Sequence, residues 1–538
     1  MAEYWLYLVA LLLLSWPLGH WIARVFDRPH LWPLEKTLFR LTGVDDDQSM
    51  NWRDYLKALA LFNLAGLFLT YLIQRTQAWH PGNTPPLRQA AVDPDLAFNT
   101  ACSFVSNTNW QAYGGESSLT WITQTMALTT QNFVSAATGI VVLLALCRGL
   151  KAQEGSSLGN FWVDLTRCLL WVLLPLSVCM TLFLTAQGVP QSLGQPASIT
   201  TLEGQTQLIP LGPVASQVAI KQLGTNGGGV YSVNSAHPLE NPTPLSNFVQ
   251  CLAILLIPAA LCHTFGAAVG DRRQGWAILA TMLLLFVPLS LFCIDQEWGN
   301  LEGKEIRFGE AASALWASAT TAASNGSVNS MHDSYTAAGG LVPIFSMLCG
   351  EVIFGGVGCG VYGFFLYALV AVFAAGLMVG RTPEYLGKKI EVFEIKMTSL
   401  GVLLMPTLVL LMAAGAVLWG PARQAVYNSG VHGFSEILYA CASMGNNNGS
   451  AFAGLAADQP YYNWVGGLVM LFSRFWTIIP VLAIAGSLAR KKRIPESAGT
   501  LPTHSPLFVV WVAVVIVIVG ALSFLPVLAM GPIAEALQ

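Results

Sequence analysis

Charged residues are scarce in this sequence. Asp, Glu, Lys and Arg make up 10% of its 538 residues, whereas about 25% is usual for a soluble domain. This number of charged residues is too small to cover the water-exposed surface of a soluble protein of this size. The composition therefore excludes a soluble protein. The net charge is −3 with no acidic or basic block, which also argues against a nucleic-acid partner.

The signatures of several catalytic and cofactor-binding classes are missing too. The ten cysteines form no CxxC pair, so neither a cysteine-based zinc site nor a disulfide framework is indicated. The eight histidines show no HExxH spacing, and there is no GxxxxGK[ST] phosphate loop. An Asp-Lys-Thr-Gly phosphorylation motif is also missing, and no predicted cytoplasmic loop is long enough for a nucleotide-binding domain. We therefore expect no resident cofactor and no ATP hydrolysis by this chain itself.

Long apolar runs dominate instead. Hydrophobic residues make up 54% of the chain, and a helix needs roughly 20 apolar residues to cross a bilayer. The sequence therefore predicts an all-α membrane protein with ten spans. They are expected at residues 4–24, 57–74, 124–147, 163–186, 246–268, 275–294, 341–378, 397–419, 463–488 and 506–530.

The seventh predicted span is too long for a single crossing. It contains the run Gly355-Gly356-Val357-Gly358-Cys359-Gly360, which is denser in glycine than close helix packing requires. We expect a broken helix there, with Gly355, Gly356, Gly358 and Gly360 forming a hinge or internal gate.

The basic residues predict the orientation of the chain. Met1-Ala2-Glu3 places no basic residue before the first apolar run, which favours an uncleaved span over a signal peptide. With the N-terminus outside, most of the 26 Lys and Arg residues fall in or beside the cytoplasmic loops, as the positive-inside rule requires. Ten spans then leave both termini outside.

Four of the outer loops share one layout, in which a short, mildly apolar stretch runs into a small, polar, glycine-rich element. The four elements are Ser106-Asn107-Thr108-Asn109, Thr225-Asn226-Gly227-Gly228, Ser324-Asn325-Gly326-Ser327 and Asn447-Asn448-Gly449-Ser450. Aligned in this way, each copy has Asn in its second position, and the third position holds Thr108, Gly227, Gly326 or Gly449.

Each loop lies between two spans, so the chain reads as four tandem span–loop–span units around one pore. The predicted division is 1–55 (first span and cytoplasmic loop), 56–150, 160–270, 273–380 and 395–490 (pore units), and 500–538 (last span).

The chemistry of these loops favours a cation pore. Non-helical backbone at membrane depth is tolerated only where it is buried in protein or lines water. Glycine lets carbonyls turn toward one axis, and four such loops can replace a cation's hydration shell. The elements contain no carboxylate, which suits a monovalent cation better than Ca²⁺ or Mg²⁺. The alternative is ordinary polar turns, where Asn and Gly are common, but four aligned copies on one side favour the pore.

Two charges fall deep inside predicted spans, away from their ends. Arg474 lies in the ninth, and charges at that depth are usually functional or paired. Glu351 lies four residues before the glycine run, where it attracts cations, pairs with Arg474, or simply sits at the interface. Lys388 and Lys389, with Arg381, either set topology or contact a partner protein.

Several runs resemble the potassium-transporting A subunits of bacterial Kdp P-type ATPases across essentially the whole chain. These runs are Asn107–Gln111, Gly224–Gly229, Val233–Pro242, Ser324–Asn329, Asn446–Gly454 and Arg381–Ile390. The resemblance implies a fold of the potassium transporter superfamily, K⁺ as the transported ion, and a selectivity filter made by the four elements. It also implies that Gln111 affects ion affinity, and that the partners are a P-type ATPase subunit and small accessory membrane subunits in the bacterial inner membrane.

Two other functional classes were weighed against this interpretation. A gradient-driven potassium channel or symporter of the same superfamily stays open as the alternative, because the residues alone lead only to a monovalent cation pore. A membrane-embedded enzyme would need clustered intramembrane His, Asp or Ser pairs, and the sequence shows none.

Overall fold

The computed structural model describes residues 1–538 except 29–30, 85–86, 156, 195, 381 and 496–500. Within the described residues, ten helices are long and apolar enough to cross a membrane, which confirms the predicted class. Their bounds are α1 Ala2–Phe26, α3 Trp52–Thr76, α6 Thr130–Lys151, α7 Phe161–Cys168 continuing into α8 Leu174–Ala186, α10 Pro244–Val269, α11 Arg272–Gln296, α14 Cys359–Val379, α15 Val392–Leu418, α18 Pro460–Ala489 and α19 Pro506–Met530. Short π-helical segments, η2 (Thr123–Thr129) and η3 (Leu169–Leu173), precede α6 and join α7 to α8.

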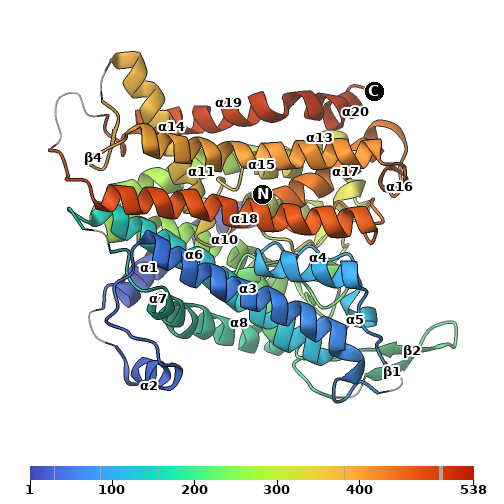
Figure 1. Cartoon of the computed structure of the whole chain (residues 1–538). Coiled ribbons are helices and arrows are strands. Elements are labelled where there is room, and N and C mark those ends of the chain that lie inside the picture. The colour runs from blue at the N-terminus through green and yellow to red at the C-terminus, as the bar shows by residue number, and fades with distance from the viewer. Residues whose placement is uncertain (29–30, 85–86, 156, 195, 381, 496–500) are drawn as a thin grey trace.

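A shorter helix precedes each of the four predicted elements. These are α4 (Pro94–Val105), α9 (Val214–Leu223), α12 (Gly309–Ala322) and α17 (Gly430–Gly445). In Figure 1, α4 and α17 lie in the half of the molecule that carries the β1–β2 hairpin, away from α2 and β4. Each short helix is largely buried along its length, so it packs among the spans instead of lying on the surface.

The predicted seventh span is broken, as expected from its glycine run. Helix α13 (Ala337–Leu348) ends before the run, and α14 begins at Cys359. Residues 349–358 between them form no regular helix. The predicted span of residues 341–378 was too long. Only α14 is long enough to be a span by itself, and α13 is a shorter apolar helix.

The four units pack around a common centre, with α1 and α19 outside them. Most of α6 and α10 is buried, whereas α3 keeps most of its side chains exposed to the surroundings. Helix α1 packs against α10, and α19 packs against α11 and α14. The residue boundaries of the six predicted domains stay a prediction.

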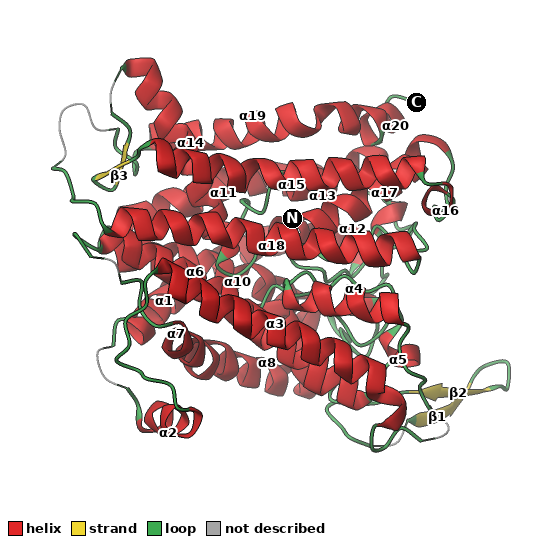
Figure 2. Ribbon diagram, in the orientation of Figure 1, coloured by secondary structure: helices red, strands yellow, loops and turns green. Residues whose placement is uncertain are grey.

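The remaining elements are small. They are α2 (Pro33–Thr42), α5 (Gly115–Ser118), α16 (Gly420–Arg423), α20 (Pro532–Ala536), η1 (Gln77–Trp79), η4 (Asn234–Ala236) and η5 (His332–Ser334). Strands β1 (Ala197–Thr200) and β2 (Thr206–Ile209) pair antiparallel, as do β3 (Glu384–Tyr385) and β4 (Lys388–Lys389). Figure 2 shows how little of the described chain these hairpins occupy beside the helices.

Candidate functional site

The four glycine-rich elements meet in a closed ring, in chain order. Hydrogen bonds join each element to its neighbours: Asn107 Nδ2 to the Thr225 carbonyl (3.0 Å), the Gly326 N–H to the Asn226 carbonyl (3.2 Å), Asn448 Nδ2 to the carbonyl of Thr320 in the third short helix (3.0 Å), and Asn447 Nδ2 to Thr108 Oγ1 (3.0 Å). The last bond closes the ring from the fourth element back to the first. Residues more than 300 positions apart are thereby held side by side.

The glycines let the backbones approach closely. A Cβ added to Gly227 would overlap the backbone of Gly326, and one added to Gly449 would overlap the Thr108 carbonyl oxygen. A Cβ on Gly326 would lie 2.9 Å from the Gly449 carbonyl carbon. Gly227 and Gly449 also have φ angles of +89° and +93°, a region that side-chain-bearing residues rarely adopt. Gly227 and Gly449 are therefore required for both reasons, and Gly326 for the close approach of the backbones alone.

The first copy is offset by one residue from the predicted alignment. The N–H of Thr108 bonds to the carbonyl five residues earlier, as do those of Asn226, Asn325 and Asn448. The residue before each has positive φ: Asn107, Thr225, Ser324 and Asn447. Thr108 is therefore the structural equivalent of the second position, and Asn109 (φ +56°) takes the place of the third-position glycines.

The offset arises because Asn occurs at both neighbouring positions of the first copy. The predicted alignment matched Asn107 to the Asn of the other elements because the residue types are identical. The structure instead aligns the end of α4 with the ends of the other short helices. Asn109 fills a position that needs positive φ, which Asn tolerates better than most residues.

Side chains behind the ring hold its loops in place. Ser135 Oγ donates to Asn107 Oδ1 (2.8 Å), and Asn109 Nδ2 donates to Asn132 Oδ1 (2.6 Å), both partners being on α6. Asn234 Nδ2 donates to the Gly227 carbonyl (2.7 Å). These bonds fix a backbone that has no regular secondary structure, although Asn109 Oδ1 and Asn132 Nδ2 have no partner among the described residues.

Gln111 bridges the first two units. Its Nε2 donates to the Gly229 carbonyl (2.9 Å), and its Oε1 accepts from the Gly229 N–H (2.9 Å). The same Nε2 lies 3.1 Å from the Tyr113 hydroxyl. Burial raises the pKa of Tyr113, so the phenol stays neutral beside this amide. Gln111 thus fixes the distance between the chain segments that leave the first two elements.

A fully buried ion pair supports the second element, and the sequence analysis missed it. Lys221 lies on α9 with its ammonium bonded to Glu240 and, at 2.7 Å, to Asn234 Oδ1. Glu240 in turn accepts from the Val230 and Tyr231 N–H groups. Both charged side chains are 0% exposed. The only available signal was a lysine within an apolar stretch followed by a glutamate in the next polar loop.

The broken helix lies directly behind the second and third elements. The N–H of Val357 donates to Thr225 Oγ1 (2.9 Å), and the N–H of Gly355 donates to the carbonyl of Ala322, at the end of α12 (2.8 Å). Glu351 and Phe354 have φ of +58° and +63° although neither is glycine. Such angles cost of order 1–3 kcal/mol each and persist where surrounding contacts impose them.

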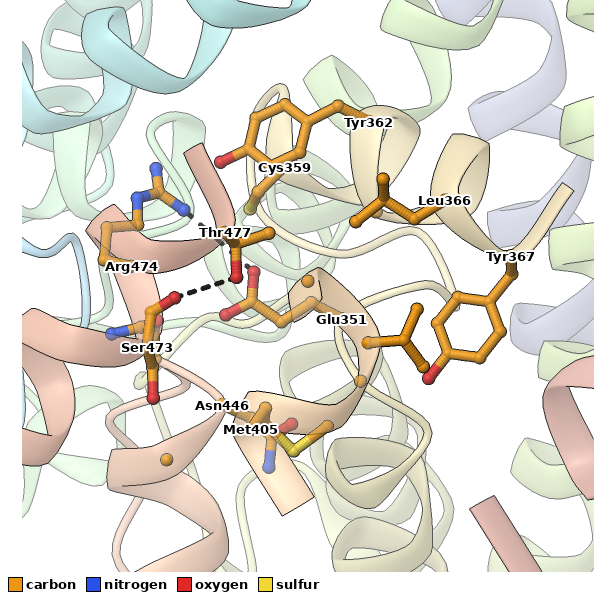
Figure 3. Close-up of a pocket in the computed structure, with 16 residues that line it drawn as sticks. Glu351, Cys359, Tyr362, Leu366, Tyr367, Met405, Asn446, Ser473, Arg474 and Thr477 are labelled. Carbon is orange, nitrogen blue, oxygen red and sulfur yellow. Dashed lines mark hydrogen bonds and ion pairs between the residues drawn. The ribbon is translucent and has the colours of Figure 1, made fainter. Parts of the chain in front are cut away.

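The break leaves a small cavity next to the fourth element. It has a volume of about 50 Å³ and is lined by Glu351, Cys359, Tyr362, Asn447, Arg474 and neighbouring residues. This exceeds the roughly 10–15 Å³, measured in this way, that a cavity needs to hold a water. Figure 3 shows Glu351 and Arg474 pointing toward each other across it. The structure therefore brings together the two intramembrane charges that the sequence singled out.

Glu351 and Arg474 form a loose pair. Arg474 Nη1 lies 4.0 Å from Glu351 Oε2, beyond hydrogen-bond distance. The other guanidinium nitrogen, Nη2, has no hydrogen-bond partner among the described residues. Gly139 makes room for it, since a Cβ there would lie 2.9 Å from Nη2. A buried arginine with unused donors beside a small polar cavity is uncommon and usually functional.

The cytoplasmic basic cluster is only partly described. Arg381 lies outside the described residues. Lys388 is buried and donates to the carbonyls of Ala152 and Lys491, both at 2.5 Å, so its ammonium is occupied within the chain. Lys389 lies 3.6 Å from Glu391.

Comparison with known proteins identifies the family. A model of the family described as potassium-transporting ATPase A subunit matches residues 5–537. Proteins named potassium-transporting ATPase potassium-binding subunit from Herpetosiphon aurantiacus and Sorangium cellulosum are each 55% identical over 99% of this chain and 98% of their own length. One from Ralstonia nicotianae is 53% identical over the same shares of both chains.

A solved structure shares the fold. The potassium transporter TrkH from Vibrio parahaemolyticus is 13% identical in sequence, with a TM-score of 0.51 over 78% of this chain and 83% of that one. At that identity the likeness concerns the fold alone. The family match and the relatives decide the assignment: this multi-pass membrane protein belongs to the potassium-transporting ATPase A subunit family.

Proposed function

We propose that the four-element ring is a K⁺ selectivity filter. Its residues are Asn107, Thr108, Asn109, Thr225, Asn226, Gly227, Gly228, Ser324, Asn325, Gly326, Ser327, Asn447, Asn448, Gly449 and Ser450. The observation that carries the proposal is the closed ring itself, because four chain-ordered loops of neutral amide and hydroxyl groups enclose one axis. The neutral oxygens of these groups can replace the hydration shell of a monovalent cation, and no carboxylate is needed.

The direction of the short helices supports the same role. Helices α4, α9, α12 and α17 all end at the ring. The C-terminal end of a helix carries partial negative charge, so four such ends favour a cation at the centre. Gln111 sets the spacing of the first two elements and on this proposal tunes affinity.

We further propose that the chain is the non-catalytic, ion-binding subunit of an ATP-driven uptake complex. Its relatives are named as subunits of potassium-transporting ATPases. The proposed partners are a P-type ATPase subunit and small accessory membrane subunits. The location is the bacterial inner membrane with both termini outside, and the cavity beside Glu351 and Arg474 receives the ion behind the filter. The segment from Gly355 to Gly360 interrupts the path there and acts as a gate.

The test uses cells that lack other potassium uptake systems. The wild-type chain, expressed with the P-type ATPase partner, is expected to restore growth and ⁸⁶Rb⁺ uptake at micromolar K⁺, and the chain without the partner is not. Gly227→Asp places a charged side chain where even a Cβ overlaps Gly326, and it is expected to abolish uptake. Gly420→Asp is the matched control, because nothing lies within 4 Å of a Cβ there.

Each outcome has a defined meaning. Uptake by the chain without the ATPase partner, down the K⁺ gradient, would favour the gradient-driven alternative. Normal uptake and ion preference in Gly227→Asp would show that the ring is not the filter.

A further inference from the structure

Four titratable side chains from separate parts of the chain meet beside the fourth unit. Asp333 lies in η5, after the third element. His432 and Glu436 lie in the first two turns of α17, and Glu535 lies on α20 near the end of the chain. His432 Nε2 is 2.9 Å from Asp333 Oδ1, and its Nδ1 is 2.7 Å from Glu535 Oε1. These four residues, the His432 cluster, include none of the filter or cavity residues.

The donor atoms of this cluster are arranged as in a metal site. One ligand atom each from Asp333, His432 and Glu436 lie within 4.8 Å of one another. One imidazole with two carboxylates is a ligand set for Zn²⁺ and related divalent transition metals. In such sites the second ring nitrogen of the histidine is normally held by a carboxylate, which fixes the ring and its tautomer. Glu535 occupies that position on His432 Nδ1.

The balance of charge also calls for a cation. Among the ion pairs of the described residues, Asp333 and Glu535 pair with His432 alone, and Glu436 pairs with no cationic side chain. Glu436 is 0% exposed and is fixed by the Tyr427 N–H (3.0 Å) and Asn428 Nδ2 (2.8 Å). A buried carboxylate is costly without a charge partner. Three carboxylates around one imidazole leave a surplus that a divalent cation would balance.

A glycine keeps the space between the carboxylates open. A Cβ on Gly454 would overlap Glu436 Oε1 and would lie 2.5 Å from Asp333 Oδ1. The side chains of Asp333 and His432 are 10% and 22% exposed, so neither is fully shielded from solvent. Metal–ligand distances near 2.0–2.1 Å place tetrahedral donors about 3.3 Å apart. The present 2.9 Å between His432 and Asp333 therefore has to widen by a few tenths of an ångström, and donor atoms up to 4.8 Å apart have to move closer together.

We propose that Asp333, His432 and Glu436 form a binding site for a divalent transition metal such as Zn²⁺, with Glu535 as the residue that positions His432. The bound metal joins η5 and α17 directly and α20 through Glu535.

The site is linked to the fourth element by packed side chains. Phe452, which follows that element, stacks on His432 with ring centroids 5.9 Å apart and on Tyr439 at 4.6 Å. The Tyr439 hydroxyl lies 2.7 Å from Ser450 Oγ. A metal at the His432 cluster therefore braces the loop that carries Asn447 to Ser450.

The test measures metal binding directly. The full-length chain, purified in detergent with any subunits that accompany it, is stripped with a chelator and titrated with Zn²⁺ by calorimetry. Metal content is then determined after gel filtration. We expect one Zn²⁺ per chain to depend on the cluster, with His432→Gln weakening that site by about tenfold or more, and Glu535→Gln by about 10-fold. His80→Gln, a histidine bonded to Thr120 outside the cluster, is the control and is expected to bind as wild type.

Co²⁺ supplies a readout of coordination. The wild-type chain is expected to develop a visible d–d absorption band on addition of Co²⁺, and Asp333→Asn, which keeps the shape of the side chain, is expected to reduce it. If His432→Gln fails to fold, Asp333→Asn decides the question by both methods. Absence of Zn²⁺ binding in the wild type, or equal binding in the folded cluster variants and His80→Gln, would overturn the proposal.

Discussion

The ring and the cavity behind it are neighbours built on opposite principles. In the ring, neutral amides and hydroxyls bond to one another across all four units, at 3.0–3.2 Å. In the cavity, two opposite charges lie 4.0 Å apart and one guanidinium nitrogen has no partner among the described residues. The ring is held by bonds between every pair of neighbouring elements, although Asn109 Oδ1 has no hydrogen-bond partner among the described residues. The cavity holds a loosely paired charge and has room for water.

The difference between the ring and the cavity indicates a different role for each in transport. Selecting among similar ions requires oxygens at fixed distances, so a ring whose loops brace one another suits that task. Moving an ion onward requires a place where contacts can be exchanged at little cost. Changes in the ring should therefore alter ion affinity and selectivity, and changes in the cavity should alter the rate of transport.

The largest effect is expected from Gly449→Ala, in the ring. The added methyl group overlaps the Thr108 carbonyl oxygen, and φ of +93° strains any alanine there. Strain of about 1–3 kcal/mol that falls wholly on the ion-bound state corresponds to a roughly 5- to 150-fold loss in affinity. Uptake of ⁸⁶Rb⁺ against K⁺ concentration measures it, with Gly420→Ala as the control at an open position. Unchanged affinity would mean that the ring does not bind the ion.

The next effect is expected from Arg474→Met, in the cavity. Removing one partner of a buried pair leaves Glu351 uncompensated, which costs about 3 kcal/mol where the pair is fully buried. We expect maximal uptake to fall about tenfold while the K⁺ concentration at half-maximal uptake stays near the wild-type value. Adding Glu351→Gln should restore part of the rate. Arg423→Met, at an exposed arginine of α16, is the control, and a change in affinity equal to that of Gly449→Ala would erase the distinction between the two regions.

A smaller effect is expected from Gln111→Leu, at the rim of the ring. The substitution removes both hydrogen bonds to Gly229. At about 0.5–1.5 kcal/mol each, their loss corresponds to roughly 5- to 150-fold weaker affinity if it falls wholly on the ion-bound state, and we expect the lower part of that range. K⁺-dependent thermal stabilisation measures binding without transport. Gln205→Leu, exposed in the turn between β1 and β2, should behave as wild type.

Much of this architecture was predictable because its causes are local. Apolar runs of spanning length define the helices, and the glycine run predicts the break before α14. The pairing of Glu351 with Arg474 was also named from sequence as one option, because charges in a span seek each other. In these cases residue type and spacing carry the information.

The rest depended on contacts between distant segments. The register of the first element follows from where α4 ends, and the neighbouring Asn107 and Asn109 disguised it. The Lys221–Glu240 pair lies 19 residues apart in sequence, and only the folded second unit buries it. The ring closure between Asn447 and Thr108 spans most of the chain. No sequence period signals such contacts.

The smallest effect is expected where the two regions join. Thr225→Val removes the hydroxyl that accepts the Val357 N–H but keeps the side-chain shape. The substitution also removes the bond that this hydroxyl donates to the Gly224 carbonyl (2.8 Å). Losing the bond to Val357 costs about 1 kcal/mol and lowers Tm by roughly 1–2 °C in a chain of this size. Thr37→Val, which breaks a local bond on exposed α2, controls for the substitution itself.

The informative comparison is whether Thr225→Val changes the rate of transport, the affinity for the ion, or both. Because Thr225 belongs to the ring and Val357 to the break, a change in rate alone assigns this bond to the gate, whereas a change in affinity alone assigns it to the filter. If both change together, the break and the ring move as one unit, and the separation between a rigid filter and an adaptable cavity fails at this junction.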